Sequence, residues 1–147
     1  MDRDRDLDPR VETLSEAECL HLLATVPVGR VVYTAHALPA VLPVAFEVDA
    51  DGRLLLALRR GGTVSRALDD TVAAFQADRL DPASRTGWSV LVRGRAEVVT
   101  DPVLHERLLR QGPRCWVGEA EPMFVAITPE LVTGRLLAAP GREARPS

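Results

Sequence analysis

The sequence predicts a mainly β protein: an antiparallel barrel carrying a few peripheral helices. The prediction depends on one long strand, on a hairpin turn between two apolar runs, and on helical signals that are few and short. Residues 85–99 alternate from Trp88 onward, with Val90 and Val92 on one face and Arg93 on the other. A two-residue period over this length indicates a long strand with one buried face, and such strands are typical of barrels and strongly curved sheets.

Signals before the long strand predict one helix and then four shorter strands. Ser15 and Glu18 form a capping box at the start of the helix, and Pro27 ends that segment. Asp51-Gly52 is a strong hairpin signal between two of the strands. Within the long strand, Gly94 predicts a bend or bulge. The shorter strands are expected at residues 29–34, 40–49, 54–58 and 72–78, with a short helix at residues 64–68.

The segment after the long strand predicts a second helix and a broken final strand. Asp101 caps this helix, with Pro102 at its first position. A strand is then expected at residues 123–127, a helical turn at Thr128-Pro129-Glu130, and a short strand at residues 134–137.

The chain is expected to form one domain that pairs with a second copy. Residues 1–10 and 139–147 are polar and predict flexible tails, which leaves residues 11–138 as the folded domain. Every residue of Leu54–Leu58 is apolar, which indicates a strand buried on both faces. We expect another subunit to cover its outer face, together with that of Leu91, because exposed apolar surface of this kind needs covering.

Composition argues against several function classes. The formal net charge is −3, and the 18 basic residues are all arginine and dispersed, so no nucleic-acid surface is expected. No apolar run reaches the length of a membrane span. Cys19 and Cys115, without a secretory leader, predict reduced thiols in a cytoplasmic protein. No spacing of Cys and His suits zinc, so no metal is expected.

A candidate anion site follows the apolar strand. Arg59-Arg60-Gly61-Gly62-Thr63 leaves this strand and opens the short helix, which also carries Arg66. The glycines permit close backbone approach, and the helix start supplies N–H groups. The arginines add bidentate donors and Thr63 a hydroxyl, so the loop suits a phosphate. The plainer interpretation is an ordinary strand-to-helix turn with solvated arginines.

Trp88 also has two interpretations. Its size favours a core residue that anchors the long strand. The alternative places its ring at the edge of a flat ligand, where it packs on the ligand or closes the pocket.

Taken together, these segments resemble the pyridoxamine 5′-phosphate oxidase-like family of flavin-binding split barrels. The resemblance runs from Leu14 to Leu137 and is most specific in Thr86-Gly87-Trp88-Ser89-Val90. The other similar segments are Leu14–Glu18, Val28–Val31, Leu42–Phe46, Arg59–Leu68, Val72–Asp78 and Thr128–Arg135.

The resemblance implies an antiparallel split β-barrel that is homodimeric, with flavin mononucleotide (FMN) bound at the subunit interface. The strand, loop and short helix around residues 59–66 would hold the phosphate. Pro43, Val44 and Ala45 would run beside the isoalloxazine ring, and Trp88 and Ser89 would line the pocket. If Phe46 faces the barrel core, alternation turns Pro43 and Ala45 outward toward the cofactor.

One position departs from the family pattern. Relatives often carry Gly-Ser-Lys or Gly-Thr-Lys in the phosphate loop, where this chain has Gly62-Thr63-Val64. Val64 cannot neutralise a phosphate. Either Arg59, Arg60 or Arg66 supplies the charge, or flavin binding is weak or lost.

Three functions stay open. The first is an FMN-dependent oxidoreductase acting on a small molecule with an electron donor such as NAD(P)H, in which the flavin supplies the redox chemistry. The second is a non-catalytic barrel module that stores or senses flavin, or binds F420 or haem. The third is a structural dimer with an empty pocket and no cofactor. The residues single out no catalytic acid or base.

Overall fold

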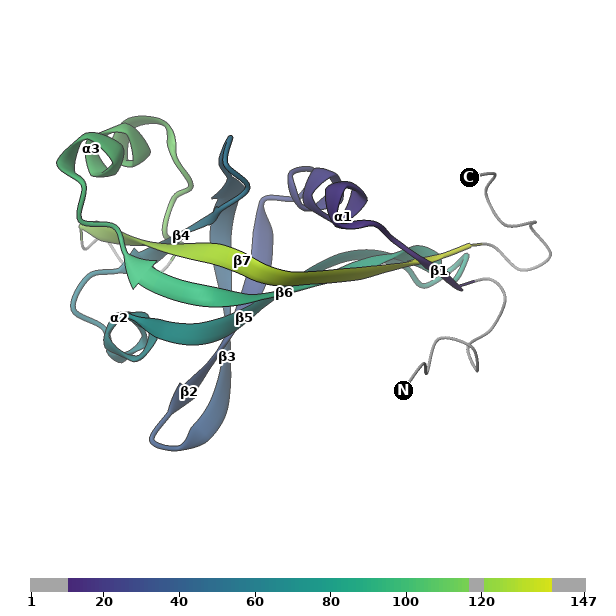
Figure 1. Ribbon diagram of the computed structural model, residues 1–147, viewed down its shortest axis with the longest axis horizontal. Coiled ribbons are helices and arrows are strands. Elements are labelled where there is room, and N and C mark those ends of the chain that lie inside the picture. The colour runs from purple at the N-terminus through teal and green to yellow at the C-terminus, as the bar shows by residue number, and fades with distance from the viewer. Residues whose placement is uncertain (1–10, 117–120, 139–147) are drawn as a thin grey trace.

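The structure is a computed structural model that describes residues 11–116 and 121–138. The tails expected at residues 1–10 and 139–147 lie outside the described residues. The described chain forms strands and three short helices (Figure 1), in the order β1 (Val11–Thr13), α1 (Glu16–Leu23), β2 (Val28–Ala35), β3 (Leu38–Val48), β4 (Leu54–Arg59), α2 (Thr63–Leu68), β5 (Thr71–Asp81), β6 (Thr86–Val98), α3 (Pro102–Gln111) and β7 (Pro122–Leu137).

The sheet closes on itself as an antiparallel barrel. Its order is β7-β4-β3-β2-β5-β6, and β6 pairs back to β7, while β1 adds to the free edge of β7. The shortest strand pairing around the barrel is between β2 and β5, where Arg30–Val32 pairs with Ala74–Gln76. The predicted mainly β fold with peripheral helices is confirmed, and the homodimer stays a prediction.

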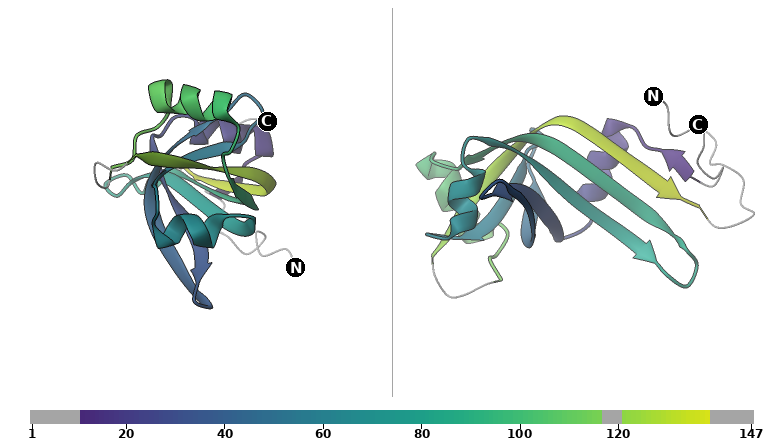
Figure 2. Two further views of the ribbon diagram at one scale, coloured as in Figure 1. Left: turned by 90° about the vertical axis from the view of Figure 1, so that its left-hand side faces the viewer. Right: turned by 90° about the horizontal axis from the view of Figure 1, so that it is seen from below.

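The strands differ greatly in length, and the longer ones project from the barrel. β5, β6 and β7 extend well beyond the barrel on one side, and the β2–β3 hairpin projects on another (Figures 1 and 2). α2 and α3 lie on opposite sides of the barrel end from which the long strands do not project. None of the helices in the described part of the chain is both long and apolar enough to cross a membrane.

Alternating side chains of the strands fill the barrel. Phe75 of β5 and Val90 and Val92 of β6 are fully buried. Phe46 of β3 packs against Phe75, with ring centroids 4.6 Å apart. Trp88 is only 7% exposed and belongs to the same cluster. The alternation read from the long strand therefore marks the core, and Trp88 packs as a core residue.

A second, smaller apolar cluster lies on the outside of the barrel. Leu55 and Ala57 of β4 and Phe124 of β7 face away from the barrel core, and Leu108 of α3 packs over them. The prediction that β4 is buried on both faces is confirmed. The prediction that another subunit covers the outer face of β4 was wrong, because α3 of the same chain covers it.

Helix α1 begins as predicted and buries a cysteine. The Ser15 hydroxyl accepts from the Glu18 N–H at 3.1 Å, and the Glu18 carboxylate accepts from the Ser15 N–H at 3.1 Å. Cys19 and Leu23 are fully buried against the barrel. Burial, with the nearby charges of Glu18 and Glu16, raises the pKa of the Cys19 thiol. The thiol therefore stays protonated and acts as a packing group.

The final strand differs from its prediction. β7 is continuous from Pro122 to Leu137, so the helical turn expected at residues 128–130 does not form. In the pairing with β6, Gly94 opposes Pro129 and Arg93 opposes Leu131, which leaves Glu130 as an extra residue. A bulge tolerates a proline that cannot donate to the ladder.

The bulge predicted at Gly94 is confirmed at this point. A Cβ on Gly94 would collide with the backbone carbonyl of Thr128 on the neighbouring strand. The close approach of β6 and β7 therefore requires a residue without a side chain.

We expect Gly134→Ala to destabilise the protein and Cys19→Ala to relieve most of that loss. A Cβ at residue 134 would lie 2.5 Å from the Cys19 Sγ atom and 3.2 Å from a methyl group of Val90. Overpacking of this kind costs about 1–3 kcal/mol. Urea unfolding of both single variants and of the double variant measures the coupling free energy. Additive losses would contradict the close contact between residues 19 and 134.

Candidate functional site

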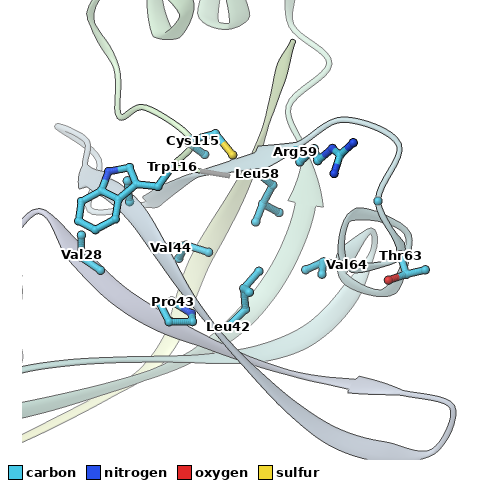
Figure 3. A pocket seen from close by; sticks show the side chains of 13 residues that line it. Val28, Leu42, Pro43, Val44, Leu58, Arg59, Thr63, Val64, Cys115 and Trp116 are labelled. Carbon is cyan, nitrogen blue, oxygen red and sulfur yellow. The ribbon is translucent and has the colours of Figure 1, made fainter. Parts of the chain in front are cut away.

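A pocket opens where β3 and β4 part. The two strands pair from Val48 opposite Leu54 as far as Ala45 opposite Ala57. Beyond this point β3 continues into its hairpin with β2, and β4 leads into the turn before α2. The pocket lies between the diverging strands (Figure 3). Its lining residues are Val28, Leu42, Pro43, Val44, Ala45, Ala57, Leu58, Arg59, Gly62, Thr63, Val64, Cys115 and Trp116.

Pro43 explains why the β3–β4 pairing ends. The Phe46 N–H donates to the Pro27 carbonyl at 3.1 Å on the β2 side. Backbone groups of even-numbered β3 residues therefore face β2, and those of odd-numbered residues face β4. The next pair of the β3–β4 ladder would set Pro43 against Arg59, but proline has no N–H to donate. The Pro43 carbonyl is consequently left at the edge of the pocket.

The pocket lies along the edge of β3 and not over one of its faces. For this reason Leu42 and Val44 line it together with Pro43 and Ala45. Pro43, Val44 and Ala45, which are expected beside the ring, all line the pocket, and their contact with a ligand stays a prediction. Phe46 points into the barrel core, as expected.

The pocket of one chain is small and mostly apolar. Its volume is about 230 Å³, which falls below the roughly 300–1,000 Å³ common for pockets that bury a drug-sized ligand. Arg59 is the charged side chain among its described lining residues, and no histidine or carboxylate lines it there. A single chain can thus cover part of a large ligand.

The end of the pocket beside α2 is suited to an anion. Gly62 is the N-cap of α2 and has no side chain to occupy the N–H groups of the first turn. The buried Ser65 hydroxyl donates to the Gly62 carbonyl at 2.8 Å and holds the turn in place. Thr63 and Arg59 lie at this same end (Figure 3). In the described part of the chain, no carboxylate pairs with the Arg59 guanidinium, which leaves it available to a phosphate.

Three residues of the predicted phosphate loop do not line the pocket. Arg60 pairs with Glu121, at 3.7 Å between Nε and Oε2, and its N–H donates to the Glu121 carbonyl. Gly61 has φ of 79°, a left-handed conformation that favours glycine, so its role is to make the turn. Arg66 is exposed in the last turn of α2. The structure brings together Arg59, Gly62, Thr63, Pro43, Val44 and Ala45.

Trp88 and Ser89 lie away from this pocket within their own chain. They occupy the end of β6 that pairs with Asp78 and Arg79, whereas the α2 end of β6 pairs with Thr71. The Ser89 hydroxyl accepts from the Gln76 amide at 3.2 Å on the outer face of the sheet. Their predicted place in a ligand site stays a prediction that depends on a second chain.

Sequence reasoning missed Cys115 and Trp116. Both follow α3 in a segment with neither helical nor strand periodicity, so no pattern placed them. The available signal was composition, because Trp116 is one of two tryptophans in a chain with 4% aromatic residues. Within the described ranges, no three metal-binding side chains come together.

The chain has relatives among known proteins. The family model described as pyridoxamine 5′-phosphate oxidase matches residues 15–136. A protein of Mycobacterium tuberculosis, "Uncharacterized protein Rv0080", is 44% identical over 140 residues, which cover 90% of this chain and 89% of the relative.

Solved structures share the fold of this chain. The FAD binding protein from Mycobacterium smegmatis is 29% identical with a TM-score of 0.67, covering 86% of this chain and 97% of that one. A FAD-binding protein from Mesorhizobium loti is 28% identical with a TM-score of 0.68, covering 86% of this chain and 96% of that one. With its barrel, its pocket at the β3–β4 divergence and a family match over nearly all described residues, this chain belongs to the pyridoxamine 5′-phosphate oxidase family.

Proposed function

We propose that the protein binds a flavin, FMN or the FMN half of FAD, in the pocket between β3 and β4. The single observation that carries the proposal is the pocket itself, an apolar slot that ends in the Arg59 guanidinium, which no carboxylate of the described residues pairs with, and the start of a helix. A flavin has the matching chemistry, because its flat ring is largely apolar and its tail ends in a phosphate. The two FAD-binding relatives support this choice of ligand.

The phosphate is assigned to Arg59, Thr63 and the first-turn N–H groups of α2. We assign to Arg59 the phosphate-binding role of the lysine that relatives often carry. Arg59 lines the pocket from β4, and its guanidinium N–H groups can donate two hydrogen bonds to one phosphate. Val64 contributes only apolar surface to the same pocket. Arg60 pairs with Glu121, and neither Arg60 nor Arg66 lines the pocket, so neither is assigned as the main phosphate ligand.

The ring is assigned to the edge of β3. Pro43 and Ala45 offer apolar contact, and the Pro43 carbonyl, left without a partner strand, can accept from a ring N–H. These residues orient the ring and exclude water from one side of it. The flavin supplies the redox chemistry when bound.

We further propose an oxidoreductase that passes electrons between a donor such as NAD(P)H and a small acceptor. This reaction needs no acid or base from the chain, which agrees with a described lining that carries no histidine and no carboxylate. The same observation also favours the second candidate, a non-catalytic module that holds flavin or the deazaflavin F420. Haem has less support, because no histidine lines the pocket in the described residues.

We propose that a second copy of the chain completes the site. The registers place Pro43, Arg30, Gln76 and Leu91 on one outer face of the sheet, since each pairs with the next across β3, β2, β5 and β6. On this outer face Val41 is 59% exposed, and the face is continuous with the pocket at Pro43. A partner seated there would enlarge the small pocket and could bring its own Ser89 toward it.

We expect Arg59→Ala to weaken FMN binding by about 10- to 150-fold, since a hydrogen bond to a charged group contributes roughly 1.5–3 kcal/mol. Quenching of flavin fluorescence on titration measures the dissociation constant. Arg110→Ala is the matched control, because it removes the same charge from the surface of α3. Equal FMN affinity in all three proteins would remove Arg59 from the site.

We expect NADPH or reduced F420 to bleach the bound flavin under anaerobic conditions. Absorbance at the flavin band follows the reaction in a stopped-flow instrument. Reduction within seconds supports the oxidoreductase. A bound flavin that stays yellow with both donors contradicts it and favours the non-catalytic module.

We expect Val41→Asp to convert the dimer to a monomer, because it buries a charge without a partner in the proposed interface. Sedimentation velocity at micromolar concentration measures the mass. Val103→Asp is the control, since Val103 is exposed on α3, far along the chain from this face. A monomeric wild-type protein, or loss of the dimer in both variants, would contradict the proposed interface.

A further inference from the structure

Trp116 is placed unusually for a tryptophan. Its side chain is 76% exposed although it lines an apolar pocket, whereas Trp88 is buried in the barrel core. A large indole left in water usually has a partner to cover it. Figure 3 shows the indole on the Val28 side of the pocket, at the end opposite Arg59 and Thr63.

The residue before this indole is anchored by packing. α3 ends at Gly112, whose N–H donates to the Leu108 carbonyl at 2.8 Å. Cys115 then packs against the outer cluster around Leu55 and Phe124. One residue later the side chain projects over the pocket and not into that cluster. Trp116 therefore follows directly on a residue that packs in the outer cluster.

We propose that Trp116 forms the aromatic wall on which the ring of the bound flavin stacks, with β3 on the other side. The inference rests on the proposed flavin binding and deepens it. The pocket has two chemically different ends, an anion end at Arg59 and Thr63 and an aromatic end at Trp116. Trp116 accordingly binds the ring and makes no contribution to binding of the phosphate. It selects tricyclic aromatic ligands over other phosphorylated molecules.

The test compares FMN, which has both the ring and the phosphate, with riboflavin, which has the ring alone. We expect Trp116→Leu to weaken FMN and riboflavin by the same factor, about threefold to tenfold, from the loss of an aromatic pair. Arg59→Ala weakens FMN much more than riboflavin, which has no phosphate. Leu109→Ala, an exposed apolar change on α3, is the control that leaves both affinities unchanged.

A spectroscopic signature separates stacking from a merely structural role. An indole stacked on a flavin gives a broad charge-transfer absorption on the long-wavelength side of the flavin band. We expect this band in the wild-type complex and in Leu109→Ala, and its loss in Trp116→Leu. Thermal unfolding of the free protein checks the fold, which should hold because Trp116 is so exposed.

The outcomes distinguish this inference from the proposed function. Wild-type affinities and an unchanged charge-transfer band in Trp116→Leu overturn the stacking role while flavin binding stands. A wild-type protein that binds neither FMN nor riboflavin overturns both. Trp116 emission that becomes shielded from iodide as protein concentration rises, without ligand, assigns the indole to a subunit contact and overturns the stacking role.

Discussion

The missing N–H of Pro43 is the constraint from which the rest of the site follows. The β3–β4 ladder runs in register until that residue, and at the next step the strand has no donor to offer. Beyond this point β4 stays paired with β7 as far as Arg59 but no longer pairs with β3, so Arg59 and the start of α2 lie across a gap from β3. The barrel stays closed around this slot, because β3 remains paired with β2 from Leu38 to Ala45 and β4 with β7 from Leu54 to Arg59.

Two apolar cores make this arrangement stable. The inner core holds the strands in a barrel, and the outer cluster fastens α3 to β4 and β7. Cys115 packs against the outer cluster and also lines the pocket beside Trp116, so this cluster connects α3 to the pocket. The outer face of β4 is thereby buried within one chain, whereas on the same outer face of the sheet Val41 of β3 is left 59% exposed.

Local chemistry made much of the fold predictable. The Ser15–Glu18 capping box, the Asp101 cap and the alternation of β6 depend on neighbours in sequence, and the structure has all three. Pro129 led to the wrong prediction of a helical turn. A proline fits within β7 because the strand has a bulge opposite Gly94, and the bulge depends on pairing with β6, which local sequence does not reveal. β1 was not predicted, because a strand of three residues is too short to show an alternation of apolar and polar side chains. Of the predicted site residues, those beside the turn before α2 and on β3 converge. Trp116 was missed because tertiary packing alone places it.

The central claim is that the anion end of the β3–β4 pocket seats a flavin phosphate. A crystal structure of the protein grown with FMN tests it most directly. The account predicts phosphate density within hydrogen-bonding distance of the Arg59 guanidinium and the Thr63 N–H, and the ring along Pro43–Ala45. Phosphate density bound elsewhere, or a pocket that stays empty at saturating FMN, would contradict it.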